Sequence, residues 1–293
     1  MVEGILNIDK PTGMTSHDVV ARVRRVAGLR RVGHTGTLDP LATGVLVVCL
    51  GKATRLVEYV VGRPKTYEAE IRLGESTNTY DSDGEITAER PLPGNLSLEM
   101  LETHLEQFRG QIEQVPPMYS AIKQNGQPLY KLARQGKTVE RPKRQVTIYQ
   151  LDILQWSEAS LSVRVVCSAG TYIRSIAHDL GESLGCGAHL TGLRRTAVGE
   201  FSTDNAVALD DLAPENVSDH LLAADLAVNH MAELRLDEAQ ANDLRYGRVI
   251  ADVSGLVTED ALVRAYTPEN EFMGLLRGGK DGRWHPHKLF LAT

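Results

Sequence analysis

The sequence of 293 residues predicts an α+β protein that is built on a mixed, largely antiparallel sheet. Three observations support this fold class. Patterns typical of strands and of helices are interleaved along the chain, but they lack the regular spacing of βαβ units. The length is sufficient for one large domain and a small one. The composition changes near Met231, after which short strands surround a single helix.

The first fifty residues are expected to form two strands, a helix and a loop. Residues 4–9 are typical of a short strand, and a turn follows at residues 10–13. Ser16 is the expected N-cap of a helix that ends at Gly28. Residues 33–43, rich in Gly, Thr and Pro, are expected to form a loop before a buried strand at residues 44–50. The buried stripe of the helix is predicted to consist of Val19, Val20, Val23 and Val26.

The middle of the chain alternates between strands and helices around one basic insertion. The stretch 119–142 is polar and contains glycine, so we expect it to be an insertion that carries a helix. The other predicted elements are a strand at 67–73, a turn at 81–84, a helix at 98–108, two strands within 151–168 (the second at 161–166) and a helix at 171–184.

The last third predicts a second, smaller domain. Residues 204–229 are acidic and contain two short helical patterns. Beyond Met231, the expected elements are strands at 233–236, 262–266, 272–277 and 288–292 and a helix at 237–246 that is closed by Gly247. We therefore predict two domains, residues 1–230, with an insertion at about 119–142, and residues 231–293.

The distribution of charge is more informative than the net charge of −6. Residues 10–31 hold six basic residues and one acid, and residues 118–145 hold seven basic residues and one acid. Residues 204–271 hold fifteen acids and four arginines, a net charge of −11, so the other residues total +5. Either basic segment alone is more typical of a solvated charged face. The two together, on a basic body with an acidic tail, favour a surface that binds a polyanion such as nucleic acid.

The sequence argues against several classes of protein. The three cysteines, Cys49, Cys167 and Cys186, are odd in number and show no CxxC spacing, so we expect neither a disulfide framework nor a metal site. No apolar stretch is long enough to cross a membrane, and no signal peptide is visible. We therefore expect a cytoplasmic protein, and a monomer is the default expectation.

The loop at residues 33–44 is the strongest candidate for chemistry. It reads Gly-His-Thr-Gly-Thr-Leu-Asp-Pro-Leu-Ala-Thr-Gly and places a potential base, His34, and a carboxylate, Asp39, just before a buried strand. On spacing alone, a turn histidine at His34 and an Asx turn of Asp39 before Pro40 are favoured over functional roles. The glycines match neither GxGxxG nor the phosphate loop GxxxxGK[ST].

This loop resembles the catalytic motif of the TruB family of tRNA pseudouridine synthases. Five further segments resemble motifs of that family, and all six occur in the family's order between Gly4 and about Thr196. The tail after Met231 resembles the small RNA-binding PUA module that commonly follows. The five segments are 8–16 (IDKPTGMTS), 65–81 (KTY, RLG and TYD), 118–136 (MYSAIK and YKLARQG), 167–175 (CSAGTYIRS) and 187–195 (GAHL and LRR).

The resemblance implies that the protein converts uridine 55 in the T loop of tRNA to pseudouridine. The C–N glycosidic bond breaks, the base turns, and a C–C bond forms, without a cofactor or a metal. Uridine 55 is buried in folded tRNA, so the base must be flipped out. Asp39 is at the catalytic position of the family. The sequence leaves open whether it attacks C1′, attacks C6 or abstracts a proton at C2′.

The resemblance also assigns the remaining site residues. Arg174 corresponds to the cation that pairs with Asp39, and Tyr67 to the aromatic residue that stacks on the flipped base and takes part in proton transfer. His34 corresponds to a residue that fills the space left in the T loop, and Leu193 to one that lines the base pocket. Lys10 and Pro11 correspond to a motif that supports the catalytic loop. The basic insertion is expected to clamp the T stem-loop through Lys123, Lys131, Arg134 and Arg141.

Three other functions compete with this one. The related archaeal and eukaryotic enzymes take their target from a guide RNA, and activity on bare tRNA would separate the two. A tRNA chaperone or binding module would not depend on the chemistry of Asp39. A glycosidase usually needs two facing carboxylates, and no second acid is identified beside Asp39.

Overall fold

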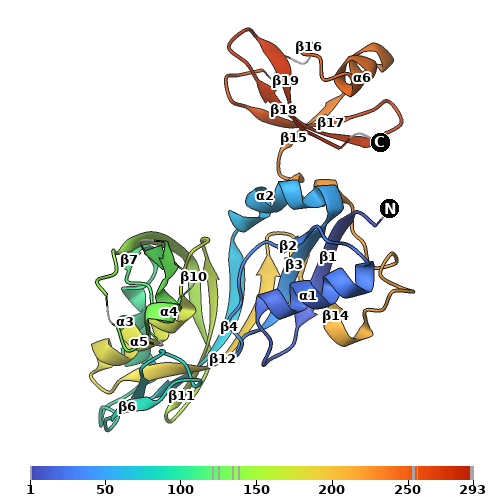
Figure 1. Ribbon diagram of the computed structural model, residues 1–293. Coiled ribbons are helices and arrows are strands. Elements are labelled where there is room, and N and C mark those ends of the chain that lie inside the picture. Colours follow the sequence, from blue (N-terminus) through green and yellow to red (C-terminus); the bar gives the residue numbers. More distant parts are fainter. Residues whose placement is uncertain are drawn as a thin grey trace.

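The computed structural model describes residues 2–120, 122–124, 126–133, 135–137, 139–252, 255 and 257–290. One large mixed sheet forms the body of the protein (Figure 1). Its strands are β1 (Gly4–Lys10), β2 (Val32–His34), β3 (Thr43–Leu50), β4 (Lys65–Leu73), β7 (Gly110–Gln114), β10 (Arg144–Ser157), β11 (Ser160–Cys167), β12 (Ala188–Val198), β13 (Phe201–Ser202) and β14 (Val207–Ala208).

The order of neighbouring strands confirms the predicted fold class. The path through the sheet is β14-β1-β3-β12-β4-β11-β10-β7, with β13 beside β12 and β2 beside β3. The pairs β1–β14 and β3–β12 are parallel. The remaining neighbours along this path are antiparallel. The sheet is therefore mixed and largely antiparallel.

The strands β1 and β3 are buried on both faces. On one face, Leu46 and Val48 pack with the helix α1 (Ser16–Ala27). On the other face, Val45 and Val47 pack with the 3₁₀ helix η1 (Gly51–Leu56) and with α2 (Val57–Val61). This arrangement explains why β3 is an almost uninterrupted apolar run, since a strand covered on both faces needs no polar side.

The start of α1 corrects one sequence prediction. The N-cap is Thr15, not Ser16. The Thr15 hydroxyl accepts from the backbone of Asp18, and the Asp18 carboxylate accepts from the backbone of Thr15, which forms a capping box. The helix ends, as predicted, at Gly28, which takes a left-handed conformation. Because Thr15 caps the helix, the hydroxyl of Ser16 is available for other contacts.

The other half of the sheet carries helices on one face. The helices α3 (Leu98–Glu106) and α5 (Ile173–Leu184) cover β4 and β11 with a shared apolar core. Leu38 and Ala42, which flank Asp39, belong to the same core. The loop that carries Asp39 therefore packs against this apolar core. The strands β5 (Glu75–Thr77) and β6 (Ile86–Glu89) form a small separate hairpin.

Several parts of the large sheet were not predicted from the sequence, namely the strands β2, β7, β12, β13 and β14 and the first residues of β10. The strand β12 is central, yet it lacks a clean alternation because it contains a glycine, a fully buried arginine, Arg195, and irregularities in its register. The strand β10 begins at Arg144, before the stretch in which we expected it. In the acidic stretch, where two short helical patterns were expected, the structure has three short 3₁₀ helices, η2 (Thr203–Asn205), η3 (Leu209–Asp211) and η4 (Ala224–Val228).

The insertion contains the expected helix, α4 (Leu129–Ala133). A two-stranded hairpin, β8 (Lys123–Gln124) and β9 (Gln127–Pro128), precedes it. Figure 1 shows α4 and α1 on opposite sides of β4 and β12. Among the described residues, none of the helices combines the length and apolar character that a membrane crossing requires.

The C-terminal residues form a second sheet above α2 (Figure 1). Its strands lie in the order β15-β17-β18-β19-β16, around a core in which Trp284 is 0% exposed. The last strand starts at Arg283, whereas the sequence predicted residues 288–292. The boundary at residue 230 remains a prediction. The elements are β15 (Ala232–Arg235), α6 (Glu238–Arg245), β16 (Ile250–Ala251), β17 (Leu262–Tyr266), β18 (Phe272–Gly278) and β19 (Arg283–Leu289).

Gly44 is required at the start of β3 because β12 passes close beside it. Its φ is +96°, and a Cβ atom there would lie 2.2 Å from the backbone oxygen of Arg195. Gly44→Ala adds this clash to a backbone strain of about 1–3 kcal/mol. Gly28→Ala is the matched control: its φ is +63°, but nothing lies within 4 Å. We expect the control to lose about 1–2 kcal/mol of unfolding free energy and Gly44→Ala to lose more. Urea unfolding that ranks them equal would contradict this.

Candidate active site

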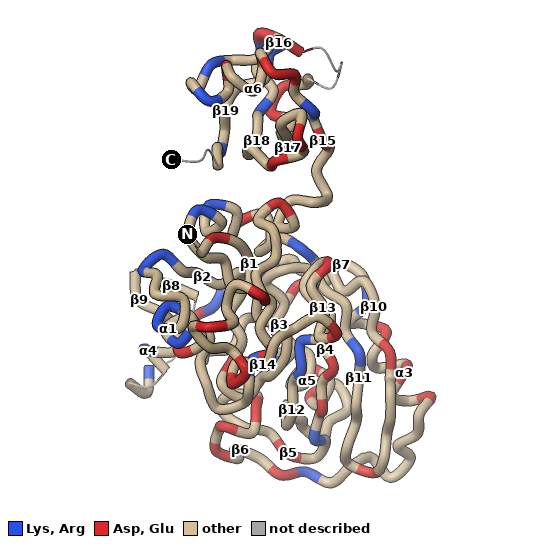
Figure 2. The backbone as a smooth tube through the Cα atoms, turned by 90° about the vertical axis from the view of Figure 1, so that its right-hand side faces the viewer, with Lys and Arg blue, Asp and Glu red and all other residues tan. Residues whose placement is uncertain are grey.

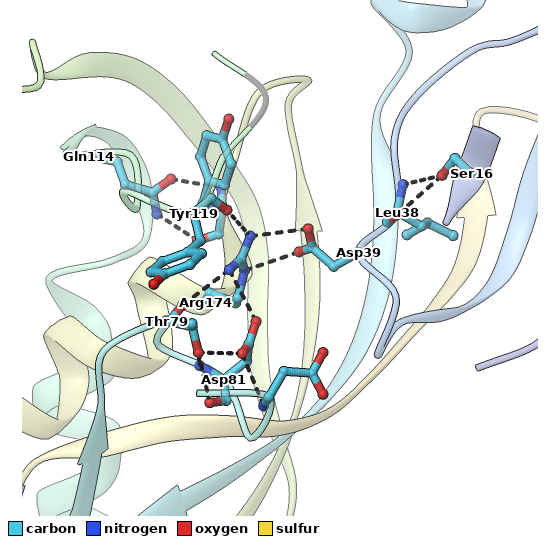
Figure 3. Close-up of polar contacts among 10 residues, drawn as sticks. Ser16, Leu38, Asp39, Thr79, Asp81, Gln114, Tyr119 and Arg174 are labelled. Atoms are coloured by element: carbon cyan, nitrogen blue, oxygen red, sulfur yellow. Dashed lines mark hydrogen bonds and ion pairs between the residues drawn. The ribbon is translucent and has the colours of Figure 1, made fainter. Parts of the chain in front are cut away.

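Asp39 lies in the loop between β2 and β3, opposite the N-terminal end of α5 (Figure 3). The guanidinium of Arg174, in the first turn of α5, meets its carboxylate through two atoms. Arg174 Nη2 donates to Asp39 Oδ1 at 3.1 Å, and Arg174 Nε lies 3.0 Å from Asp39 Oδ2. The predicted contact between the two residues is therefore present, as one charge-assisted hydrogen bond and one close ion-pair contact.

A second carboxylate, that of Asp81, contacts the same guanidinium. The sequence analysis did not identify Asp81 as a site residue. Asp81 Oδ2 lies 3.1 Å from Arg174 Nη1, and both side chains are 5% exposed. Asp81 Oδ1 accepts from the Thr79 hydroxyl at 2.5 Å and from the Asp83 backbone at 3.2 Å. The sequence placed Asp81 in a turn, and only its position in the Thr-Tyr-Asp segment that resembles a family motif could have indicated the site.

Arg174 is held in place from several directions. Beyond the two carboxylates, it donates to the carbonyl oxygens of Thr79 at 3.1 Å and of Tyr119 at 2.8 Å. Tyr119 is at the base of the insertion, so this contact connects the insertion to the site. The amide of Gln114, at the end of β7, pairs with both peptide groups of Tyr172, at 2.9 and 2.7 Å, directly before α5. The cation is therefore part of a rigid frame.

The ion pair is asymmetric in its exposure. The side chain of Asp39 is 38% exposed, whereas that of Arg174 is 5% exposed. The carboxylate thus faces the solvent side, and its partner lies behind it. Burial raises the pKa of Asp39 above its usual range, Arg174 opposes that shift, and the nearby charge of Asp81 adds to it. Arg174 is therefore the group that favours the ionised form of Asp39.

Tyr67 lies on β4 and shares the apolar core with Leu38. Its side chain is buried, and the whole residue is 8% exposed. Burial raises the pKa of its phenol, and the guanidinium of Arg195, which interacts with the hydroxyl, opposes the shift. The phenol is therefore neutral at physiological pH, and the ring is largely covered. Stacking on a flipped base remains a prediction.

His34, at the end of β2, is a neutral residue in the folded protein. Its Nδ1 accepts from the backbone of Gly36 at 3.3 Å, and its ring meets that of His17 edge to face at 5.4 Å. Burial lowers the pKa of His34 to about 4, and the charges of His17 and Arg195 act in the same direction. The acceptor role of Nδ1 is consistent with this neutral form.

This shift predicts an acid-dependent loss of stability. An unfolded histidine binds its proton near pH 6.5, whereas folded His34 does so only near pH 4. Between these values the unfolded state binds more protons, so the unfolding free energy falls as the pH falls from about 6.5 to 4. We expect His34→Gln to show a shallower decline over that window in urea unfolding. Equal slopes for the variant and the unchanged protein would contradict the assignment.

Lys10 supports the loop from beneath and does not face solvent. It is fully buried, and its Nζ donates to the carbonyl oxygens of Pro11 and Met14 at 2.7 Å each and of Pro40 at 3.4 Å. Burial lowers its pKa to about 8, and the charge of Asp39 opposes that shift. This placement agrees with a supporting role and leaves no exposed ammonium group for RNA.

The structure describes Leu193 and three of the four basic residues of the insertion that were predicted to bind RNA. Leu193, on β12, is partly buried against the core that contains Tyr67. Lys131 is exposed on α4. Arg141 donates to the carbonyl oxygen of Pro116 at 3.0 Å, which places its guanidinium at the base of the insertion. The backbone of Lys123 lies in β8, and Arg134 lies outside the described residues.

Metal-binding clusters and thiols of lowered pKa do not occur among the residues that the structure describes. No cluster of three or more His, Cys, Asp or Glu side chains with metal-binding geometry occurs there. Burial raises the pKa of the Cys49 thiol to about 12 and that of Cys167 to about 11, so both thiols stay protonated and unreactive.

The arrangement supports chemistry by a single carboxylate, that of Asp39. Asp39 is partly open to solvent and oriented by a cation. Asp81 is buried, and its oxygens are occupied by Arg174, Thr79 and Asp83. The two acids therefore do not face each other across an open site, which a glycosidase acid–base pair would require. A single oriented carboxylate can attack carbon, stabilise positive charge or accept a proton.

Comparison with known proteins gives a consistent result over nearly the whole chain. Residues 24–173 match the TruB family pseudouridylate synthase N-terminal domain, and residues 174–229 match the tRNA pseudouridylate synthase B C-terminal domain. A tRNA pseudouridine synthase B of Dehalococcoides mccartyi is 46% identical over 99% of this chain and 97% of its own. That of Coxiella burnetii is 43% identical over 98% and 94%.

Solved structures of similar fold include chains from two multi-component complexes. The chain aligns with one in a Cbf5–Nop10–Gar1 complex at a TM-score of 0.75, with 27% identity over 98% of this chain and 85% of that one. A chain in an H/ACA ribonucleoprotein, bound to a substrate RNA that contains 2′-deoxyuridine, aligns at 0.74 with 25% identity, over 99% and 85%.

Proposed function

Because this chain belongs to the TruB family of pseudouridylate synthases, we propose that it isomerises uridine 55 in the T loop of tRNA without a guide RNA. Its enzyme class, a tRNA pseudouridine synthase, follows from its family and its relatives. The choice of nucleotide, the roles of the site residues, action as a monomer without a protein partner and a cytoplasmic location are parts of the proposal.

The observation that carries this proposal is the oriented, partly exposed carboxylate of Asp39. Its two contacts with Arg174 favour one orientation, and 38% of its side chain is exposed. Isomerisation requires the C–N glycosidic bond to break, the base to turn, and C5 of the base to bond to C1′. In this proposal Asp39 acts at C1′, at C6 or on the C2′ proton, and Arg174 keeps it ionised.

Base flipping gives Tyr67 and Leu193 their proposed roles. The target uridine has to leave the stacked T loop to reach Asp39. Stacking of a base on an aromatic ring is worth about 1–3 kcal/mol, a substantial part of an extrusion cost of a few kcal/mol. Tyr67 supplies the ring and, after the base turns, takes part in removing the proton from C5. Leu193 lines the apolar side of the pocket, and His34 occupies the space left in the loop.

The placement of basic side chains supports binding of the T stem-loop. The basic segment of α1 and the basic insertion lie on opposite sides of β4 and β12 (Figure 1), and Figure 2 places α1, α4, β8 and β9 along one side of the molecule. Arg25 on α1 and Lys131 and Lys137 on the insertion are exposed. A folded RNA loop held between them would bind with strong salt dependence.

The acidic, PUA-like C-terminal module contributes less to this interface. It is fixed to the body through Arg55, which donates to the carbonyl oxygen of Leu289 at 2.6 Å, and through the ion pair between Lys288 and Glu58. Tyr59 and His287 are also in hydrogen-bond contact, at 3.0 Å. We propose that the module contacts RNA only lightly and chiefly stabilises the fold.

The experiment that tests the proposal uses the purified chain alone. It is incubated with an unmodified tRNA transcript, with a hairpin that contains only the T stem-loop, and with the same hairpin carrying cytidine in place of uridine 55. We expect pseudouridine in the first two RNAs and none in the third. Modification only after guide RNA or partner proteins are added would instead favour a guide-dependent enzyme.

A further inference from the structure

The residue before Asp39 is held by a hydroxyl group that the reaction does not use. Ser16 is the first residue of α1 and is 1% exposed. Its Oγ accepts from the backbone nitrogen of Leu38 at 2.8 Å and donates to the backbone oxygen of Leu38 at 3.1 Å (Figure 3). One hydroxyl thus satisfies both the donor and the acceptor of the residue that leads into Asp39.

These two bonds are not easily replaced. Leu38 is 3% exposed and packs in the core, so water has little access to its backbone. A buried peptide group that loses its partner is costly, and the chain moves to regain one. The capping of α1 does not need Ser16, because Thr15 and Asp18 form the capping box. The hydroxyl of Ser16 therefore serves the loop and not the helix.

The loop is fixed on the other side of Asp39 as well. The carbonyl oxygen of Pro40 accepts from the backbone of Gly13 at 2.8 Å and from Lys10, and the Thr12 hydroxyl donates to the carbonyl oxygen of Leu41 at 3.2 Å. On the Leu38 side, Arg195 donates to the carbonyl oxygen of Gly36 at 3.1 Å, and Ser16 supplies the side-chain contact to the residue directly before Asp39. Loss of the Ser16 hydroxyl would release that residue while the other flank of Asp39 stays attached.

We propose that Ser16 is a positioning residue, which orients the Asp39 carboxylate toward Arg174 and the substrate by fixing the peptide groups of Leu38. This inference rests on the proposed role of Asp39. Ser16 is buried and acts through Leu38, so it does not contact the RNA itself. Displacement of a reacting group by about 1 Å can cost about 10²-fold in rate. We therefore expect Ser16→Ala to reduce kcat about tenfold to a hundredfold, with KM and tRNA affinity nearly unchanged.

The test compares Ser16→Ala with two other variants. Ser16→Thr keeps the hydroxyl and should recover most of kcat. Thr267→Val is the matched control, because the buried Thr267 hydroxyl accepts from the backbone of Glu271 at 3.2 Å in the C-terminal module. It should lower the melting temperature and leave kcat per folded molecule unchanged. All assays use full-length protein and tRNA transcript well below the lowest melting temperature.

A pH profile separates positioning from simple loss of stability. If Asp39 loses its alignment with Arg174, the pH at which activity falls on the acid side should move upward in Ser16→Ala and return in Ser16→Thr. A Ser16→Ala protein with unchanged kcat per folded molecule and an unchanged acid limb overturns the inference. If the unchanged protein forms no pseudouridine at all, the proposed function has failed, which is a different result.

Discussion

Asp39→Asn is expected to abolish pseudouridine formation while the protein still folds and binds tRNA. The amide has nearly the shape of the carboxylate, but it has neither the negative charge nor the basicity that the proposed reaction needs. Arg174 remains paired with Asp81, so the substitution does not leave a buried cation alone. We expect kcat to fall at least about 10⁴-fold, as for other residues that react directly.

A nearby acid provides the control for this prediction. Asp83 is exposed, and only its backbone contacts Asp81. Asp83→Asn removes the same charge close to the site and should change kcat by less than about threefold, since surface charges are weakly coupled in water. Single-turnover assays at saturating tRNA, with binding measured separately, give both values. Asp39→Asn activity within tenfold of the unchanged protein would exclude a direct role for this carboxylate.

Arg174→Lys should have the second largest effect, although it conserves charge. The guanidinium contacts Asp39, Asp81 and the carbonyl oxygens of Thr79 and Tyr119 at once, and a single ammonium group cannot reproduce that set. Loss of an oriented cation in a site costs about 10²–10³-fold in kcat. Carbonyl groups left without partners should lower the unfolding free energy by about 1–3 kcal/mol.

The direction of the pH effect follows from the electrostatics. Arg174 lowers the pKa of Asp39 against the effect of burial, so weakening that contact raises the pKa. Activity of Arg174→Lys should therefore fall at a higher pH on the acid side and recover in part as the pH rises. Arg164→Lys is the control: its pair with Glu68 is exposed, and its loss should cost less than about 0.5 kcal/mol. If the acid side of the pH–activity profile of Arg174→Lys is not shifted, the result contradicts the account.

The sequence predicted the elements whose patterns are dictated by burial. Strand β3 is an apolar run, and α1 and α5 have apolar stripes at helical spacing and end at left-handed glycines, so their positions were nearly right. The sequence did not predict strand β12, because the polar residues of this strand find their partners only after folding. Arg195 donates to the carbonyl oxygens of Val45 at 2.7 Å and Gly36 at 3.1 Å, contacts that no local pattern indicates.

The same distinction applies to the site. Asp39, Arg174 and Tyr67 were identified through their resemblance to family motifs, and the structure brings Asp39 and Arg174 into contact. From the sequence, Asp81 was interpreted as a turn residue and Ser16 as a helix cap. Each contacts the site through a residue that is distant in sequence, so its local pattern did not indicate the site. Arg174 is 93 residues after Asp81, and Leu38 is 22 residues after Ser16. Local sequence patterns do not reveal a role that depends on such tertiary contacts.

The most direct test of the central claim is a nucleotide-resolution map of pseudouridine in an unmodified tRNA transcript treated with the purified chain alone. The account predicts modification at uridine 55, none at other uridines, and none with Asp39→Asn. Modification at a different uridine, or modification at uridine 55 that survives in Asp39→Asn, would contradict it.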